Sequence, residues 1–323
     1  MKKIVVVLAA LVPLASASLA HAQSDVAAAR VNPDPDAVRA YWTPARMANA
    51  IPRGAVQLGG PANPAAPGGH GGGGGGGGGT PSPSTALKVS WPAAPDVTYT
   101  NGKVFFHDGN FDYVCSGTAV SSTTGDVVWT AGHCVNDGGQ NTWVTSWSFV
   151  PAYNSGTSFP SPTFVATHLY TSMSWANTGE FGNDFGAAYV ANDPNTGNTL
   201  AQTIGFSRRM SFTPNFSTGS GHVIHAFGYP AEGKFNGQSL YRCDTYVSQI
   251  DTSASPSDMG IPCELNGGSS GGAWVDANGN QVSNNSYTYR GLKNVMFGPT
   301  YASTANNVLS AADQKSSSGT THN

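Results

Sequence analysis

Short apolar runs separated by turn-forming residues make up the chain from about Val97 onward. Gly, Asn, Asp, Ser or Pro stands in nearly every gap, and this pattern is typical of an all-β sandwich or barrel. About ten strands in roughly 220 residues are too many for one small barrel, so they favour a single all-β domain of two packed antiparallel barrels. The expected strands are 103–106, 113–120, 126–130, 143–150, 164–168, 185–190, 222–228, 239–247, 272–275 and 293–297.

Helical periodicity in this part of the chain is confined to its end. Val308, Leu309 and Ala312 fall on one face of a helix there. We expect Ser303 or Thr304 to cap that helix, because a hydroxyl oxygen can accept a hydrogen bond from an amide of the first turn.

The first quarter of the chain does not have the pattern of a globular domain. Lys2 and Lys3, an apolar run over 4–15 and the small residues around Ala22 predict a signal peptide over 1–22. The alternative is an uncleaved membrane anchor, but the run is too short to span a bilayer. We therefore expect a secreted protein, extracellular or periplasmic, that has no membrane contact once the signal is removed.

Residues 23–67 are rich in Ala and Pro, and they contain one expected helix over 35–42 that is broken near Pro44. Composition alone leaves two readings of this segment, a pro-segment or a disordered spacer. An unbroken glycine run over 71–79 follows, so residues 68–90 are predicted to be a linker and 91–323 the folded domain.

The chain has four cysteines, Cys115, Cys134, Cys243 and Cys263. Four cysteines allow three pairings, and the sequence alone does not choose among them. Disulfides persist in oxidising compartments, which agrees with export. The alternative is a metal site, but the Cys-x-x-Cys and His-x-x-x-His spacings typical of zinc are absent from the sequence. No carboxylate-rich loop suggests calcium either, so we expect no metal and no cofactor.

Charge gives a further exclusion. The formal net charge is −3 and only 10% of residues are charged. A nucleic-acid surface needs clustered Lys and Arg, so we expect no nucleic-acid partner. We expect a monomer.

His133 stands in the sequence Thr-Ala-Gly-His-Cys at the end of an expected strand. An imidazole can take and return a proton near neutral pH, so His133 is a candidate general base. The alternative is a buried structural histidine. The strand, the small residues and the adjacent cysteine together favour catalysis.

Ser270 stands in a glycine-lined turn, between Gly268 and Gly271. Such a turn can expose a nucleophilic hydroxyl, and the Gly268 and Ser270 amides would form an oxyanion hole with the Ser269 amide beside them. The alternative is a flexible Gly/Ser linker. Cys263 before the turn and an apolar run after it argue that the turn is anchored.

Asp184 directly precedes the apolar run 185–190, where a strand would enter the core. A carboxylate there could orient His133 and stabilise the imidazolium. The alternative is an ordinary turn aspartate after Asn183. A rival, Asp193, lies in a plain Asn-Asp-Pro turn.

The order His133, Asp184, Ser270 and the segments 115–119, 130–134, 183–185, 227–230 and 268–272 resemble the chymotrypsin-like (trypsin-like) serine peptidases, particularly the bacterial secreted branch related to glutamyl endopeptidases. The resemblance covers roughly residues 100 to 312. It implies two barrels of the six-stranded type with a C-terminal helix on the second, and Cys115–Cys134 and Cys243–Cys263 disulfides. It also favours a zymogen, because Tyr41 to Met47 resembles the pro-segments of related enzymes.

The resemblance also assigns residues around the substrate. Ser286, in the segment 285–287, would pair with the substrate backbone. Glu264 falls where trypsin-like enzymes place the base of the primary pocket, and a carboxylate there would prefer Arg or Lys; the alternative is an exposed glutamate in a loop of different length. Glutamyl endopeptidases have a histidine where this chain has Asn285, which argues against strict glutamate preference.

Trypsin-like enzymes carry an aspartate where this chain has Ser269. We therefore expect maturation to remove the leader without forming the activating ion pair of those enzymes. The sequence predicts a serine endopeptidase acting on protein or peptide substrates. The alternatives are a catalytically silent binding or adhesion module on the same scaffold, and an esterase with the same triad.

Overall fold

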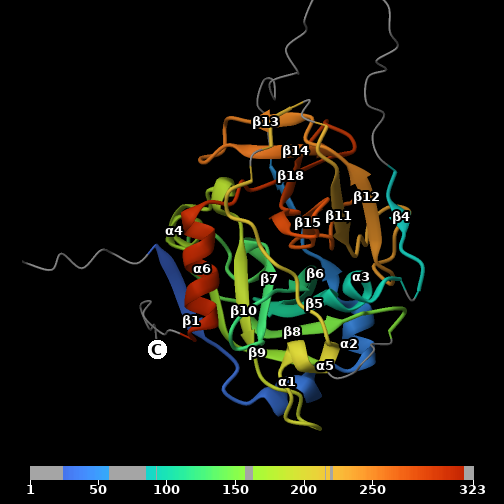
Figure 1. The fold of residues 1–323 in the computed structure, drawn as a ribbon. Helices are drawn as coiled ribbons and strands as arrows, with labels where there is room; N and C mark the ends of the chain where they lie inside the picture. The colour runs from blue at the N-terminus through green and yellow to red at the C-terminus, as the bar shows by residue number, and fades with distance from the viewer. Residues whose placement is uncertain are drawn as a thin grey trace, which may run out of the picture.

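The computed structural model describes residues 25–57, 85–91, 93–156, 163–214, 216–218 and 221–315. The predicted signal peptide and most of the predicted linker lie outside these ranges. The described part is built mainly of antiparallel strands in two halves, coloured largely green and orange in Figure 1. No helix among the described residues is long and apolar enough to cross a membrane.

The first half is a closed barrel of six strands, because β9 pairs with both β10 and β8. Its buried side includes the large side chains Trp147, Phe149 and Phe164. The strands in barrel order are β9 (Phe164–Ser172), β10 (Gly186–Val190), β7 (Val127–Thr130), β6 (Phe111–Ala119), β5 (Asn101–Asp108) and β8 (Thr145–Pro151).

The second half contains two five-stranded sheets. One sheet consists of β16 (Gln281–Asn284), β15 (Ala273–Asp276), β11 (Ile224–Gly228), β12 (Tyr241–Thr245) and β4 (Leu87–Lys88). The other consists of β13 (Gln249–Asp251), β14 (Asp258–Pro262), β18 (Val295–Gly298), β17 (Tyr287–Tyr289) and β3 (Ala55–Gln57). The all-β class and all ten expected strands are confirmed, whereas β3, β4, β13, β14, β16 and β17 were not expected, and β4 lies inside the predicted linker 68–90.

The described helices are short. The longest is α6 (Ser303–Asp313), which buries Ala305, Val308 and Ala312. It packs against β9, β10 and the N-terminal strand β1 (Val26–Arg30), all on the side of the first half (Figure 1), whereas the resemblance placed it on the second barrel. The expected cap was wrong: Ala302 is the N-cap, without a side-chain hydrogen bond, and Ser303 is the first helical residue. The other domain helices are α3 (Pro95–Thr100), α4 (Met173–Thr178) and α5 (Leu200–Ile204).

Residues 25–57, which we call the leader, pack on the domain. The strand β1 (Val26–Arg30) pairs with β9, and β2 (Ile51–Pro52) pairs with β6. Between them lie α1 (Pro35–Tyr41), which confirms the expected helix, and α2 (Pro44–Asn49). Trp42, which is 4% exposed, donates from its indole nitrogen to the Ser146 carbonyl at 2.6 Å.

Two disulfides join Cys115 to Cys134 and Cys243 to Cys263, the pairing that the resemblance implied. The first ties β6 to the turn after β7, and the second ties β12 to the residue after β14. Each bridge closes a loop of about 20 residues, which in the chain-entropy model stabilises the fold by about 3 kcal/mol.

One lysine, Lys103 on β5, is buried and 3% exposed. Its ammonium donates to the Gly237 carbonyl at 2.9 Å and lies 4.8 Å from the ring centroid of Tyr153. Burial lowers the pKa of Lys103 to about 8 from 10.5. The unfolded chain still binds this proton between those two values, so the lysine's contribution to stability should rise with pH across that window.

We expect Lys103→Met to raise the free energy of unfolding at pH 7 by about 2 kcal/mol, because it removes a charge that burial disfavours. The gain should shrink as pH rises from 8 to 10, where the native lysine becomes neutral. Urea unfolding across this range measures the difference, and Lys88→Met, at an exposed lysine, is the control. Parallel curves for the Lys103 variant and the wild type would contradict the assignment.

Candidate active site

His133 lies in the short 3-10 helix η1 (Gly132–Cys134), directly after β7. The Cys115–Cys134 disulfide fixes this turn to β6, and only 5% of the His133 side chain is exposed. The disulfide and the burial of the side chain therefore fix the position of the imidazole, independently of any hydrogen bond that the ring makes.

Asp184 lies between a second 3-10 helix, η2 (Phe181–Asn183), and β10. It is fully buried, and it contacts His133 twice: one carboxylate oxygen accepts from the His133 amide and the other lies against Nδ1, both at 2.8 Å. A hydrogen bond from Nδ1–H to a carboxylate makes Nε2 the acceptor of a neutral ring. Among the described residues Nε2 has no hydrogen-bond partner.

Ser286 adds a third donor to this carboxylate, since its hydroxyl hydrogen-bonds to Oδ2 of Asp184. The Asn284 side chain also donates to the Asp184 carbonyl at 3.2 Å. Asp184 is therefore bound to the first half through His133 and to the second half through β16 and the residue before β17.

Ser270 lies in a turn that needs glycine on both sides. Gly268 has φ +92° and Gly271 has φ +82°, a region that residues with a Cβ rarely adopt. Ser116 on β6 holds the turn, because its hydroxyl donates to the Gly268 carbonyl at 2.9 Å and its amide to the Ser270 carbonyl at 2.7 Å. Cys134 Sγ lies 3.9 Å from that carbonyl and within 4.8 Å of a ring nitrogen of His133. The turn and the imidazole thus meet at the disulfide.

Two amides in the turn are available to a ligand. Within the described ranges neither the Gly268 nor the Ser270 amide donates a hydrogen bond, whereas the Ser269 amide donates to the Asn266 carbonyl at 2.9 Å. The Ser269 hydroxyl donates to the same carbonyl at 2.5 Å. This leaves the Gly268 and Ser270 donors for an oxyanion, and Ser269 secures the turn.

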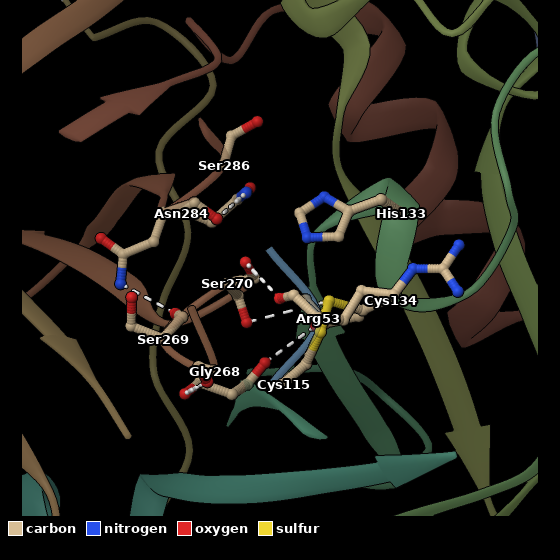
Figure 2. Close-up of a disulfide and its surroundings, with 12 residues drawn as sticks. Arg53, Cys115, His133, Cys134, Gly268, Ser269, Ser270, Asn284 and Ser286 are labelled. Carbon is tan, nitrogen blue, oxygen red and sulfur yellow. Dashed lines mark hydrogen bonds between the residues drawn. A yellow bond between two sulfur atoms is a disulfide. The ribbon is translucent and has the colours of Figure 1, made fainter. Parts of the chain in front are cut away.

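The Ser270 hydroxyl donates to the backbone carbonyl of Arg53 at 3.1 Å. Figure 2 shows this bond as a dashed line, with the His133 ring nearby and unbonded to Ser270. The leader, rather than the imidazole, is therefore the hydrogen-bond partner of the serine in this structure.

A cavity of about 150 Å³ lies beside Ser270, and Ser286, Tyr287, Thr288 and Met296 supply one side of it. Tyr287 is fixed from behind, because its hydroxyl donates to Asp251 at 2.6 Å and its ring lies 4.5 Å from that of Phe181. Burial, reinforced by the nearby Asp258 and Asp251 carboxyls, raises the pKa of Tyr287. The tyrosine hence stays neutral and keeps donating, which holds this strand in place.

Glu264 lies elsewhere. Its carboxylate accepts from the Lys234 ammonium at 2.7 Å and from the Ala86 amide at 2.8 Å. It is not among the described residues that line the cavity beside Ser270. The role of Glu264 at the base of the primary pocket therefore stays a prediction, and the ion pair with Lys234 agrees with the alternative of a glutamate in a loop of different length.

The one metal-ligand-like cluster among the described residues consists of Cys115, His133 and Cys134. Both sulfur atoms are used in the disulfide, so they offer no thiolate to a metal.

Sequence reasoning missed three contributors to the site. Ser116 follows Cys115 in a segment noted for the cysteine, and Asn285, considered only for specificity, donates to the Ser269 carbonyl at 2.9 Å. Ser116 and Asn285 are short polar residues next to a noted motif, and this position is the sequence signal by which they could have been identified. Arg53 had no signal, because its backbone makes the contact.

Comparison with solved structures gave close matches to proteases. The thermostable serine protease AL20 from an extremophilic microorganism is 38% identical with a TM-score of 0.63, and the match covers 69% of this chain and 100% of that one. The protease Anisep from Arthrobacter nicotinovorans is 34% identical with a TM-score of 0.61, covering 67% and 96%. A Glu endopeptidase in complex with MPD is 20% identical with a TM-score of 0.55, covering 71% and 96%, and shows the shared fold. Neither a family model nor a curated protein matched the sequence.

Proposed function

Because the chain belongs to the chymotrypsin-like serine peptidase family, we propose that it is a secreted serine endopeptidase that cleaves peptide bonds through an acyl-enzyme. The observation that carries this proposal is the double contact of Asp184 with His133, through the backbone amide and through Nδ1. This arrangement leaves Nε2 as the acceptor of a neutral ring, without a hydrogen-bond partner among the described residues, which supports its role as the base.

In the proposed reaction His133 Nε2 takes the proton of the Ser270 hydroxyl as Oγ attacks the substrate carbonyl carbon. The Asp184 carboxylate stabilises the imidazolium that forms. His133 then returns the proton to the leaving amine, which leaves an ester on Ser270. Water, deprotonated by the same imidazole, hydrolyses the ester and restores the serine.

The oxyanion of each tetrahedral intermediate would be bound by the Gly268 and Ser270 amides, which have no acceptor among the described residues. The substrate backbone would add as a strand beside Ser286 and Tyr287, and the cavity lined by these residues would receive a side chain.

Secretion and a zymogen state are part of the proposal. The two disulfides fit an oxidising compartment, and the predicted signal peptide supplies the route. The leader packed on the domain fits a pro-segment better than a free spacer, because it buries Val38 and Trp42.

A fluorophosphonate probe, which phosphonylates an activated serine, tests the proposal. A cysteine protease, which itself takes up no label, first digests the leader, and size-exclusion chromatography then separates the leader fragments from the domain. We expect peptide mapping to find one adduct, on Ser270, and labelling to abolish cleavage of a protein substrate. Side-by-side turnover of a peptide anilide and a simple ester separates an endopeptidase from an esterase.

The neighbouring hydroxyl of Ser269 is an internal control, since it is buried and hydrogen-bonded to Asn266. Failure of the folded, leader-free protein to take up the probe would favour the silent binding module. An adduct on any serine other than Ser270 would overturn the assignment of the nucleophile.

A further inference from the structure

The leader crosses the site between the two halves. Its β2 strand pairs with β6, and the Arg53 amide donates to the Val114 carbonyl at 3.0 Å. Two residues after Arg53 the strand β3 begins, and it pairs with β17, the strand that the proposed function assigns to the substrate backbone. Residues 51–57 therefore occupy the place where a substrate would add.

The contact at the serine is not that of a substrate. A carbonyl about to be attacked presents its carbon to Oγ and its oxygen to the oxyanion donors. Here the Arg53 oxygen itself accepts the Ser270 proton, and the Gly268 and Ser270 amides donate to no described group. The hydroxyl has a single proton, so Ser270 cannot donate it to His133 Nε2 at the same time.

The leader is anchored by contacts other than the hydrogen bond with the serine. The Trp42 indole is buried against Phe105, and β1 forms five residue pairs with β9. At the cleft, the Arg53 guanidinium pairs with Asp108 and lies 5.0 Å above the Tyr113 ring. None of these contacts depends on the chain that joins the leader to the domain.

We propose that residues 25–57 are a built-in inhibitor that caps the nucleophile with the Arg53 carbonyl and remains bound after the linker is cut. Activation then requires release or destruction of the leader, and linker cleavage alone is insufficient. This inference rests on the proposed function and adds its regulation.

The test uses the full chain with the recognition sequence of a site-specific cysteine protease placed in the glycine run 71–79. Fluorophosphonate labelling rates and size-exclusion profiles are measured before and after cutting. We expect the cut wild type to co-elute as one complex and to label as slowly as the intact chain. Cut Trp42→Ala should label at least about tenfold faster, because truncating a buried anchor weakens binding strongly. Trp91→Ala, at an exposed tryptophan, is the matched control and should behave as the wild type.

A charge swap gives a second, independent measurement. Arg53→Asp places a carboxylate against Asp108 and should speed labelling, while Arg53→Asp combined with Asp108→Arg should slow it again. Faster labelling cannot come from unfolding, because the probe reacts only with an assembled site.

The outcomes separate the two proposals. Equally fast labelling of the intact chain, the cut wild type and the Trp42 variant would overturn the inhibitor but keep the peptidase. No labelling of any folded variant would overturn the peptidase and the inhibitor with it. Cleavage of the chain after Arg53 in the wild type, but not in Ser270→Ala, would show that Ser270 attacks the Arg53 carbonyl as it attacks a substrate. This result would also overturn the proposal that the carbonyl caps the serine.

Discussion

Replacing Ser270 with alanine should lower kcat by about 10⁶-fold with little change in the fold, because it removes the proposed nucleophile. The turn should persist, since backbone bonds and Ser116 hold it and the Ser270 hydroxyl hydrogen-bonds only to the leader among the described residues. The measurement is kcat and KM on a peptide substrate, with the leader removed from both proteins by the same added protease. Thermal unfolding checks that the variant is folded.

The same assignment predicts a smaller loss for Asp184→Asn, about 10⁴-fold in kcat, because an amide can hold His133 in the wrong tautomer. Asp193→Asn is the matched control: that aspartate is also buried, its carboxylate accepts from the Asn195 amide, and the change should leave kcat unchanged. Full activity of the Asp184 variant, or equal losses for the two aspartates, would contradict the proposed triad.

Gly271→Ala should destabilise the protein by about 3–5 kcal/mol, from left-handed backbone strain together with overpacking. Gly271 has φ +82°, and a Cβ there would lie 2.1 Å from Thr130 Oγ1 and 2.5 Å from the Ser116 carbonyl oxygen. Both neighbours belong to packed strands of the first half, so neither can yield. Chemical denaturation measures the loss, and fluorophosphonate labelling at a temperature where the variant is still folded measures the damage to the turn.

Gly279→Ala is the control for the cost of left-handed backbone strain alone. Gly279 also has φ +82°, but no atom lies within 4 Å of the position that its Cβ would take. We expect this change to cost about 1 kcal/mol. The difference between the two variants therefore reports the close contact of the Ser270 turn with β6 and β7. Equal stabilities would show that the contact can relax.

Strands whose own sequence is apolar or alternating could be predicted. Strands that are stabilised by residues distant in the sequence could not. The ten expected strands are apolar or alternating and end at turn residues. In contrast, β16 contains the buried polar residues Ser283 and Asn284, whose side chains donate to the Pro299 and Asp184 carbonyls. Polar residues predict a loop unless those distant partners are known.

The residues of the candidate site also divide into those with a local sequence motif and those without one. His133 and Ser270 stand in local motifs whose residue types suffice to suggest their roles, and Asp184 was placed from chain order and the strand after it. All three assignments remain predictions until kinetics test them. The contact of Ser270 with Arg53 spans 217 positions and uses a backbone oxygen, so no side-chain pattern could reveal it. Glu264 is paired with Lys234 and does not line the cavity beside Ser270, so counting back from the serine leaves its role at the pocket base a prediction.

The pairing of β1 with β9 has a consequence for the proposed release of the leader. Residues 168–172 of β9 pair with β1 over its whole length, and among the described strands β1 is the neighbour on that side. Its departure bares a row of backbone amides and carbonyls that can template the addition of another polypeptide. If the leader is released as proposed, the domain should therefore associate edge to edge more readily than the chain that keeps its leader.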